Sequence, residues 1–269
     1  MKKINILGCG VMGSQIANLF SIMGYEVNIW NRTRINKDNL LRQKKLILKL
    51  LKISDNNGII KIIDNFQEFS NNITIECLAE KFELKKKYLE DVSQKVSKEI
   101  FTNSSSIQTN KIGKKINLMH FFNPISLRIV EFNGSVKFGE ETLNIFADLK
   151  KLNFELIEVG NYTGFAFNKI LFSEISNFFF IIEKENIKKK EILKIFKKIN
   201  NNLDILNTLD IIGIDTSLQI LKNLNDEYGN YYIPEILNIC LSKKILGKKN
   251  KTSIKSIFDL ENYPKKGND

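Results

Sequence analysis

The chain has 269 residues, of which 43% are hydrophobic, so it can bury one large core or two ordinary ones and should not be disordered. Its net charge of +11 suits an anionic ligand, but the lysines are scattered along amphipathic segments, and we expect no nucleic-acid partner. The three cysteines are widely spaced, which argues against a disulfide framework and against a metal site. With no cleavable signal and no apolar run of about 18 residues, we expect a cytoplasmic protein without a membrane partner.

The beginning of the chain predicts a strand, a helix and a second strand. Residues 3–7 and 26–30 are short apolar runs, and residues 11–23 carry apolar side chains at the spacing of a helix that packs on a sheet. Strand, helix and strand within so short a stretch form a βαβ unit. Such a unit implies a parallel sheet with a right-handed crossover.

The alternation of strands and helices continues as far as Gly164 and then gives way to helices alone. Further strands are expected at residues 59–63, 73–77, 100–103, 117–119 and 154–159, with helices notably at 83–96 and 140–152. From Phe165 onward the expected helices are 168–183, 189–200, 215–225 and 234–246. These patterns predict an α/β domain over residues 1–163 and a smaller, all-helical domain over residues 164–269.

A glycine-rich turn joins the first strand to the first helix. Gly8, Gly10 and Gly13 form G-x-G-x-x-G in the context that makes this pattern typical of a dinucleotide-binding, Rossmann-type domain. The first glycine allows a tight turn, the second lets a pyrophosphate approach the backbone, and the third lets helix and strand pack closely. The alternative is a structural glycine turn in an unrelated α/β fold.

The end of the second strand lacks the acidic residue that usually binds the ribose 2′-hydroxyl of NAD. Asn31 stands there, followed by Arg32, Thr33 and Arg34. A carboxylate would repel a 2′-phosphate, whereas a neutral amide beside a guanidinium and a hydroxyl can accept one. We therefore expect NADP(H) to be favoured over NAD(H). Compositional drift from Asp to Asn, with a solvated Arg34, is the alternative.

Several short segments then follow one another in a characteristic order. They are residues 76–80 with Lys85, N-S-S-S-I at 103–107, H-F-F-N-P at 120–124, V-E at 130–131 and G-F-x-x-N at 164–168. Together they resemble the 3-hydroxyacyl-CoA dehydrogenase family over most of the chain, and H-F-F-N-P is the most specific of them. The resemblance implies oxidation of an L-3-hydroxyacyl thioester, with CoA as the expected carrier, to the 3-ketoacyl thioester, or the reverse reduction.

His120 is the only histidine of the chain and the expected general acid/base. Removing a proton from an alcohol while hydride leaves needs a base whose pKa lies near the working pH, and imidazole meets that need without perturbation. The alternative is a hydrogen-bonded core histidine. By resemblance, Glu131 is its carboxylate partner, although the spacing is one residue shorter than the family pattern. For Glu131 the alternative is a surface glutamate at the start of a strand.

The resemblance assigns two further polar side chains to the substrate. Ser105 corresponds to the serine that hydrogen-bonds the reacting oxygen, with a shift to Ser104 or Ser106 as the alternative. Asn168 corresponds to the asparagine that holds substrate and histidine from the helical domain, and its alternative is a helix cap. Such donors act by polarising the reacting group.

The expected cofactor contacts combine the glycine turn, the end of the second strand and the family segments. They are Gly8, Gly10, Val11, Met12, Gly13, Asn31, Arg32, Thr33, Glu80, Lys85 and Asn103. Glu80 and Lys85 match a cofactor-contacting pair of the family, and their alternative is a solvated helix start. The resemblance also implies a homodimer formed through the helical domain.

Two competing functions use the same fold. A β-hydroxyacid dehydrogenase acting on a free acid would share the glycine turn, but that family has a lysine where this chain has Asn168, with Lys169 one position late. A non-catalytic dinucleotide-binding protein would be expected to lose some of the site residues. Residues 35–58 are too few for the whole helical hairpin that helps the family bind CoA, which leaves the thioester carrier open.

Overall fold

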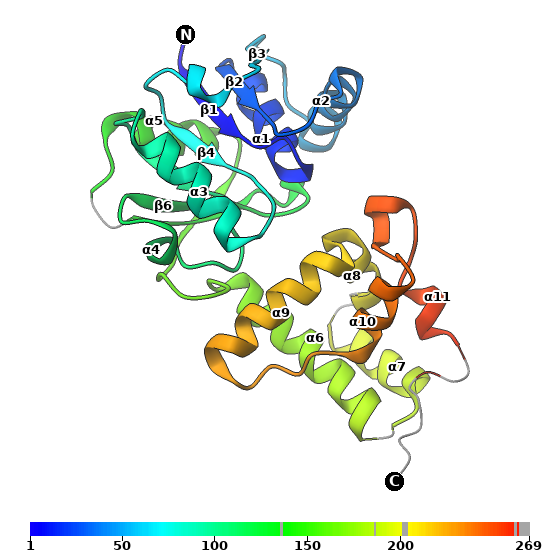
Figure 1. Cartoon of the computed structure of the whole chain (residues 1–269). Helices are drawn as coiled ribbons and strands as arrows, with labels where there is room; N and C mark the ends of the chain where they lie inside the picture. Colours follow the sequence, from blue (N-terminus) through cyan, green and yellow to red (C-terminus); the bar gives the residue numbers. More distant parts are fainter. Residues whose placement is uncertain (135–136, 186, 201–203, 261–262, 264–269) are drawn as a thin grey trace. The chain divides into compact units, whose positions relative to one another are not determined.

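The computed structural model describes residues 1–134, 137–185, 187–200, 204–260 and 263. It divides the chain into two compact units, Met1–Tyr162 and Thr163–Asp269 (Figure 1). Within the described ranges, no helix is both long and apolar enough to cross a bilayer.

The first unit is built on a mixed sheet that is eight strands wide over the described residues, in the order β3-β2-β1-β4-β5-β6-β7-β8. The strands are β1 Lys3–Leu7, β2 Glu26–Trp30, β3 Ile59–Ile62, β4 Thr74–Glu76, β5 Ile100–Thr102, β6 Ile116–Phe121, β7 Ile129–Asn133 and β8 Glu155–Glu158. Strands β1 to β6 are parallel, β7 is antiparallel to β6, and β8 is parallel to β7. The carboxyl ends of β1, β4, β5 and β6 therefore share one edge.

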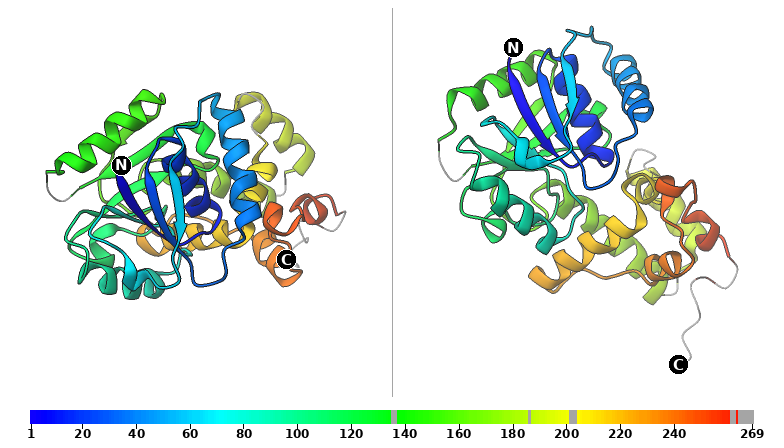
Figure 2. Two further views of the ribbon diagram at one scale, coloured as in Figure 1. Left: turned by 90° about the horizontal axis from the view of Figure 1, so that it is seen from above. Right: turned by 45° about the horizontal axis from the view of Figure 1, so that its top comes forward.

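Helices lie on both sides of this sheet (Figure 2). They are α1 Val11–Ile22, α2 Lys37–Leu51, α3 Phe82–Ser93, α4 Thr109–Ile112 and α5 Glu140–Lys151. One apolar cluster packs α1, α2 and α5 on one face, and another packs α3 and α4 on the other. Both faces of the central strands are therefore covered. This explains why every residue of β6 and every residue of β1 except Lys3 is buried.

The second unit is helical in its described part. Its helices are α6 Phe167–Lys184, α7 Lys189–Ile199, α8 Ile205–Ile212, α9 Ile214–Tyr228, α10 Glu235–Ser242 and the short α11 Lys255–Phe258. They enclose their own apolar cluster. Gly213 separates α8 from α9 with φ of 99°, a conformation that glycine adopts without strain.

The predicted fold class is confirmed: a Rossmann-type sheet domain is followed by a helical domain. Strand β7 and helices α2, α4, α8 and α11 were not among the predicted ranges. Strand β7 was missed because Ile129–Asn133 carries a buried glutamate in place of simple alternation. Helix α8 was missed because eight residues are too few to show a clear helical periodicity.

Candidate active site

The glycine turn between β1 and α1 has the geometry that a dinucleotide requires. Gly8 has φ of +111°, and a Cβ on it would lie 2.7 Å from the Cys77 carbonyl oxygen. A Cβ on Gly13 would lie 2.0 Å from the Gly8 carbonyl oxygen, so neither position accepts a side chain. A Cβ on Gly10 would meet nothing within 4 Å. The first and third glycines thus shape the turn, and the second leaves open space beside the start of α1.

This open space suits a pyrophosphate. Helix α1 begins at Val11, has no acidic residue in its first turn, and is long enough for its N-terminal amides to favour an anion. Val11 is half exposed at this end of the helix, and Met12 follows it. The turn lies between β1 and β4, where the strand order reverses. Such a switch point is where open α/β sheets bind their ligands.

Asn31 ties the glycine turn to the end of β2. Its Oδ1 accepts a hydrogen bond from the Cys9 backbone N–H at 3.0 Å, and its Nδ2 donates to Thr33 Oγ1 at 3.0 Å. Arg32 and Thr33 are exposed beside it. The side-chain amide of Asn31 therefore connects the glycine turn to the residues after β2, while the neighbouring Arg32 is exposed to solvent.

His120 and Glu131 form a buried pair on adjacent strands. The antiparallel register of β6 and β7 places them directly opposite each other, and His120 Nδ1 lies 2.9 Å from Glu131 Oε2. Their exposed fractions are 7% and 1%, so the alternative of a surface glutamate is wrong. A short 3₁₀ helix, Ile125–Leu127, lies in the connection between the strands, and the shortened spacing still permits the contact.

The pairing determines which nitrogen of His120 is available. An ionised carboxylate only accepts hydrogen bonds, so Nδ1 carries the proton that is shared with Glu131. In the neutral ring Nε2 is then an acceptor and can take a proton from a substrate hydroxyl.

Asn103 links β6 to the residues that follow β5. Its Oδ1 accepts a hydrogen bond from the backbone N–H of Phe121, the residue after His120, at 2.8 Å.

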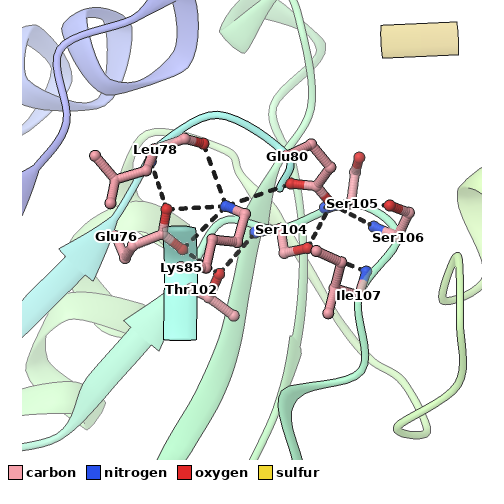
Figure 3. Close-up of polar contacts among 9 residues, drawn as sticks. All are labelled: Glu76, Leu78, Glu80, Lys85, Thr102, Ser104, Ser105, Ser106 and Ile107. Carbon is pink, nitrogen blue, oxygen red and sulfur yellow. Dashed lines mark hydrogen bonds and ion pairs between the residues drawn. The ribbon is translucent and has the colours of Figure 1, made fainter. Parts of the chain in front are cut away.

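A charged network occupies the same edge of the sheet, where β4 and β5 end (Figure 3). Lys85 Nζ lies 2.9 Å and 3.0 Å from the two carboxylate oxygens of Glu76 and 3.3 Å from Glu80 Oε2. Lys85 is only 1% exposed, so the alternative of a solvated helix start is wrong. Glu80 Oε1 accepts hydrogen bonds from the turn at residues 104–106.

Both ends of the Lys85–Glu80 contact stay ionised at neutral pH. Burial alone would raise the pKa of the Glu80 carboxyl, but the Lys85 charge and the hydrogen bonds from Ser104 and Ser106 outweigh it and hold that pKa below its ordinary value. Burial likewise favours a low pKa for Lys85, and the charges of Glu76 and Glu80 outweigh it and raise that pKa.

Asn168 belongs to the helical unit. It is a buried residue in the first turn of α6, and the N-cap of that helix is Ala166, so the alternative that Asn168 caps the helix is wrong. The ammonium group of its neighbour Lys169 lies over the ring of Tyr228, 4.5 Å from the centroid.

The structure thus groups the predicted residues of the first unit into three clusters: the glycine turn with Asn31 and Thr33, the His120–Glu131 pair, and Glu80 with Lys85 and Ser105. Sequence reasoning gave no role to Glu76 and Thr102, and it named Ser104 and Ser106 only as alternatives to Ser105. The available signal was a carboxylate and a hydroxyl at the ends of two apolar strands, Glu76 and Thr102.

Family models give the decisive comparison. The NAD binding domain of 3-hydroxyacyl-CoA dehydrogenase matches residues 3–161, and the C-terminal domain of the same enzyme family matches residues 164–256. The chain belongs to the 3-hydroxyacyl-CoA dehydrogenase family. The resemblance read from the sequence motifs is therefore confirmed, and the chain is a member of an oxidoreductase family with a dinucleotide-binding domain.

Individual relatives agree with this assignment. A 3-hydroxybutyryl-CoA dehydrogenase of Clostridioides difficile is 26% identical over 272 residues, which cover 93% of this chain and 97% of the relative. A probable 3-hydroxybutyryl-CoA dehydrogenase of Bacillus subtilis is 25% identical, with 93% and 95% covered. The fold is shared with FadB2 of M. tuberculosis, at a TM-score of 0.81, 19% identity and coverage of 94% and 98%. It is also shared with PaaH1, a (S)-3-hydroxybutyryl-CoA dehydrogenase of Ralstonia eutropha, at a TM-score of 0.76, 24% identity and the same coverage.

Proposed function

We propose that the chain interconverts an L-3-hydroxyacyl-CoA and the corresponding 3-ketoacyl-CoA by hydride transfer with a nicotinamide cofactor. His120 is the general acid/base. The observation that carries this proposal is the buried pair of His120 with Glu131, at 2.9 Å on adjacent strands of a dinucleotide-binding domain. It is the arrangement in which a carboxylate orients an imidazole and stabilises its protonated form.

In the oxidation direction, His120 Nε2 accepts the proton of the substrate 3-hydroxyl as the carbon–oxygen double bond forms. The bound nicotinamide supplies the hydride acceptor in this direction and the hydride donor in the other. Glu131 stabilises the resulting imidazolium through the Nδ1 hydrogen bond. In the reduction direction, the same imidazolium returns its proton to the developing alkoxide.

Ser105 and Asn168 are proposed to hydrogen-bond the substrate. Ser104 and Ser106 are buried and donate their hydroxyls to Glu80, whereas Ser105 is partly exposed, which supports Ser105 as the serine that meets the substrate oxygen. Asn168 is proposed to contribute from the helical unit. A donor aimed at the developing oxyanion is worth about 3 kcal/mol of transition-state stabilisation.

For the cofactor we propose NADP(H) in preference to NAD(H). The support is local: the neutral Asn31 replaces a carboxylate, and the exposed Arg32 and Thr33 stand beside it. The matching family model describes an NAD binding domain, so NAD(H) is the alternative that the experiment must address. The proposed cofactor contacts are those predicted from the sequence: Gly8, Gly10, Val11, Met12, Gly13, Asn31, Arg32, Thr33, Glu80, Lys85 and Asn103.

We also propose that the two domains have separate functions. Residues 1–163 would bind the dinucleotide, and residues 164–269 would bind substrate and form a homodimer in the cytoplasm. Helix α6 exposes the apolar side chains of Ile170 and Phe180, which supports a partner surface on this unit.

The test is the consumption of NADPH and NADH by the purified protein with acetoacetyl-CoA as substrate and free acetoacetate as the matched control. Turnover of the thioester alone supports the proposal. Turnover of the free acid at an equal rate would favour a β-hydroxyacid dehydrogenase. Cofactor binding without turnover of either substrate would favour a non-catalytic dinucleotide-binding protein.

A further inference from the structure

Three consecutive residues converge on one oxygen atom of Glu80 (Figure 3). Glu80 Oε1 accepts the hydroxyl of Ser104 at 2.5 Å, the backbone N–H groups of Ser105 and Ser106 at 3.1 Å and 3.0 Å, and the hydroxyl of Ser106 at 2.9 Å. Hydrogen bonds to an ionised acceptor are roughly twice as strong as neutral ones. The turn at residues 104–106 is therefore folded around a single anionic oxygen.

The second oxygen of Glu80 is held from the other side. Lys85 Nζ lies 3.3 Å from Glu80 Oε2, and Lys85 is in turn held by both oxygens of Glu76. Glu76 Oε2 accepts the hydroxyl of Thr102 at 2.6 Å, and Thr102 Oγ1 accepts the Ser104 N–H at 3.1 Å. The network therefore begins and ends on the same segment, and Glu80 has little freedom to move away from the turn.

The three serines of this turn differ in exposure. Ser104 and Ser106 are 0% and 1% exposed and donate their hydroxyls to Glu80, while Ser105 between them is partly exposed and donates its backbone N–H. We propose that Glu80 is a positioning residue for Ser105, acting through this turn and separately from any contact with the cofactor. The inference rests on the proposed function, in which the Ser105 hydroxyl meets the substrate oxygen.

A double-mutant cycle tests this role. Glu80→Gln keeps the size of the side chain but removes its charge, and its carboxamide cannot accept both from the serine turn and from Lys85. A displacement of about 1 Å in a polarising group costs on the order of 10²-fold in rate. We expect kcat for acetoacetyl-CoA, measured at saturating cofactor, to fall by about that factor in Glu80→Gln.

The decisive arm is the same substitution in a Ser105→Ala background. If Glu80 acts through Ser105, the double variant is no slower than Ser105→Ala alone, because residues that act as one unit are not additive. If the two losses multiply, or if Glu80→Gln raises the KM for cofactor while kcat is kept, the positioning role is refuted. Where Glu80→Gln does not fold, Glu80→Asp takes its place, since it keeps the charge near Lys85 and withdraws the carboxylate from the turn.

A second measurement does not depend on activity. Hydrogen exchange of the amides of Ser105 and Ser106 should speed up at least about tenfold in Glu80→Gln, because both amides lose an ionic acceptor. Glu83→Gln, on the exposed first turn of α3, is the matched control and should leave this exchange unchanged. Unchanged exchange in Glu80→Gln refutes the inference. Two results together would separate the two proposals. If exchange is faster in Glu80→Gln but the wild-type protein does not turn over acetoacetyl-CoA, then Glu80 does hold the turn at residues 104–106, and it is the proposed function that is refuted.

Discussion

The two units of the molecule use their inward-facing carboxylates differently. In the first unit, Glu131 pairs with an imidazole and Glu80 with a buried ammonium group, both near the carboxyl edge of the sheet. In the helical unit, Glu183 accepts from the Tyr232 and Tyr263 hydroxyls at 2.5 Å each. It also accepts the Glu235 N–H, at the start of α10, at 2.9 Å.

The partner of each carboxylate therefore indicates its use. Neutral hydroxyls and backbone amides make Glu183 a clamp that joins α6 to α10 and to Tyr263. At the carboxyl edge of the sheet, a titratable or cationic partner lets a carboxylate stabilise a charge that appears during reaction, or hold a turn that meets substrate. The same chemical change, Glu to Gln, should thus cost activity in one unit and stability in the other.

Among the substitutions that remove a carboxylate charge, Glu131→Gln has the largest expected effect. A glutamine can still accept from Nδ1–H, so the fold is retained, but the imidazolium loses its counter-charge, and the amide can instead favour the wrong tautomer. We expect kcat with acetoacetyl-CoA to fall by about 10³-fold with cofactor affinity retained, measured by steady-state kinetics and by titration of cofactor binding. A kcat within about threefold of wild type would show that the pair is structural.

Glu183→Gln is the matched change in the helical unit. The substitution replaces one carboxylate oxygen of Glu183 with an NH₂ group, which donates hydrogen bonds. That group would face the tyrosine hydroxyls and backbone N–H groups that donate to Glu183 in the wild type. The expected loss is about 1 to 3 kcal/mol of unfolding free energy, read from urea unfolding, with kcat of the folded protein unchanged. A lower kcat with an unchanged unfolding free energy would contradict the expectation that Glu183 contributes to stability and not to activity.

Arg32→Ala probes a charge that faces solvent instead of a buried partner. If the guanidinium meets a 2′-phosphate, the affinity for NADPH should fall about tenfold, which is about 1.4 kcal/mol, and the affinity for NADH should stay the same. Parallel titrations with both cofactors give the answer. Equal losses in both would remove the argument for NADP(H).

Asp148→Asn should have the smallest effect and depends on pH. Asp148 on α5 accepts from Lys2 at 2.5 Å, Tyr25 at 2.7 Å and Lys151 at 2.9 Å, near the amino ends of β1 and β2. Burial alone would raise the pKa of this carboxyl, but these hydrogen bonds outweigh it and lower the pKa from 3.8 to about 2. A lowered folded-state pKa stabilises the protein above the ordinary value and ceases to do so as the pH falls through the lowered one.

We therefore expect Asp148→Asn to lose about 1 kcal/mol of unfolding free energy at pH 7 and less at pH 3, with kcat unchanged. Urea unfolding at the two pH values measures the difference. An equal loss at both would mean that Asp148 acts by packing. Asp148 lies away from the carboxyl edge of the sheet, where we place the reaction. A lower kcat in Asp148→Asn would therefore contradict the expectation that a charged carboxylate of the first unit affects kcat only at that edge.

Much of the fold was predictable because its signals are local. The glycine turn at Gly8–Gly13 and the apolar strands covered on both faces are visible within short windows of sequence. The sequence did not show in the same way that His120 and Glu131 face each other, because a separation of eleven residues does not reveal an antiparallel register. The inward turn of Lys85 was hidden as well, since a lysine in a lysine-rich run is ordinarily solvated. Its partner Glu76 comes from another element, which periodicity cannot identify.

The most direct test of the central claim is kcat for acetoacetyl-CoA reduction by His120→Ala, compared with wild type at equal cofactor saturation. If the buried pair moves the proton, kcat falls by at least about 10³-fold while the variant still folds and binds cofactor. If the variant keeps more than about a tenth of the wild-type kcat, His120 is not the proton-transfer residue and the account of the site is wrong.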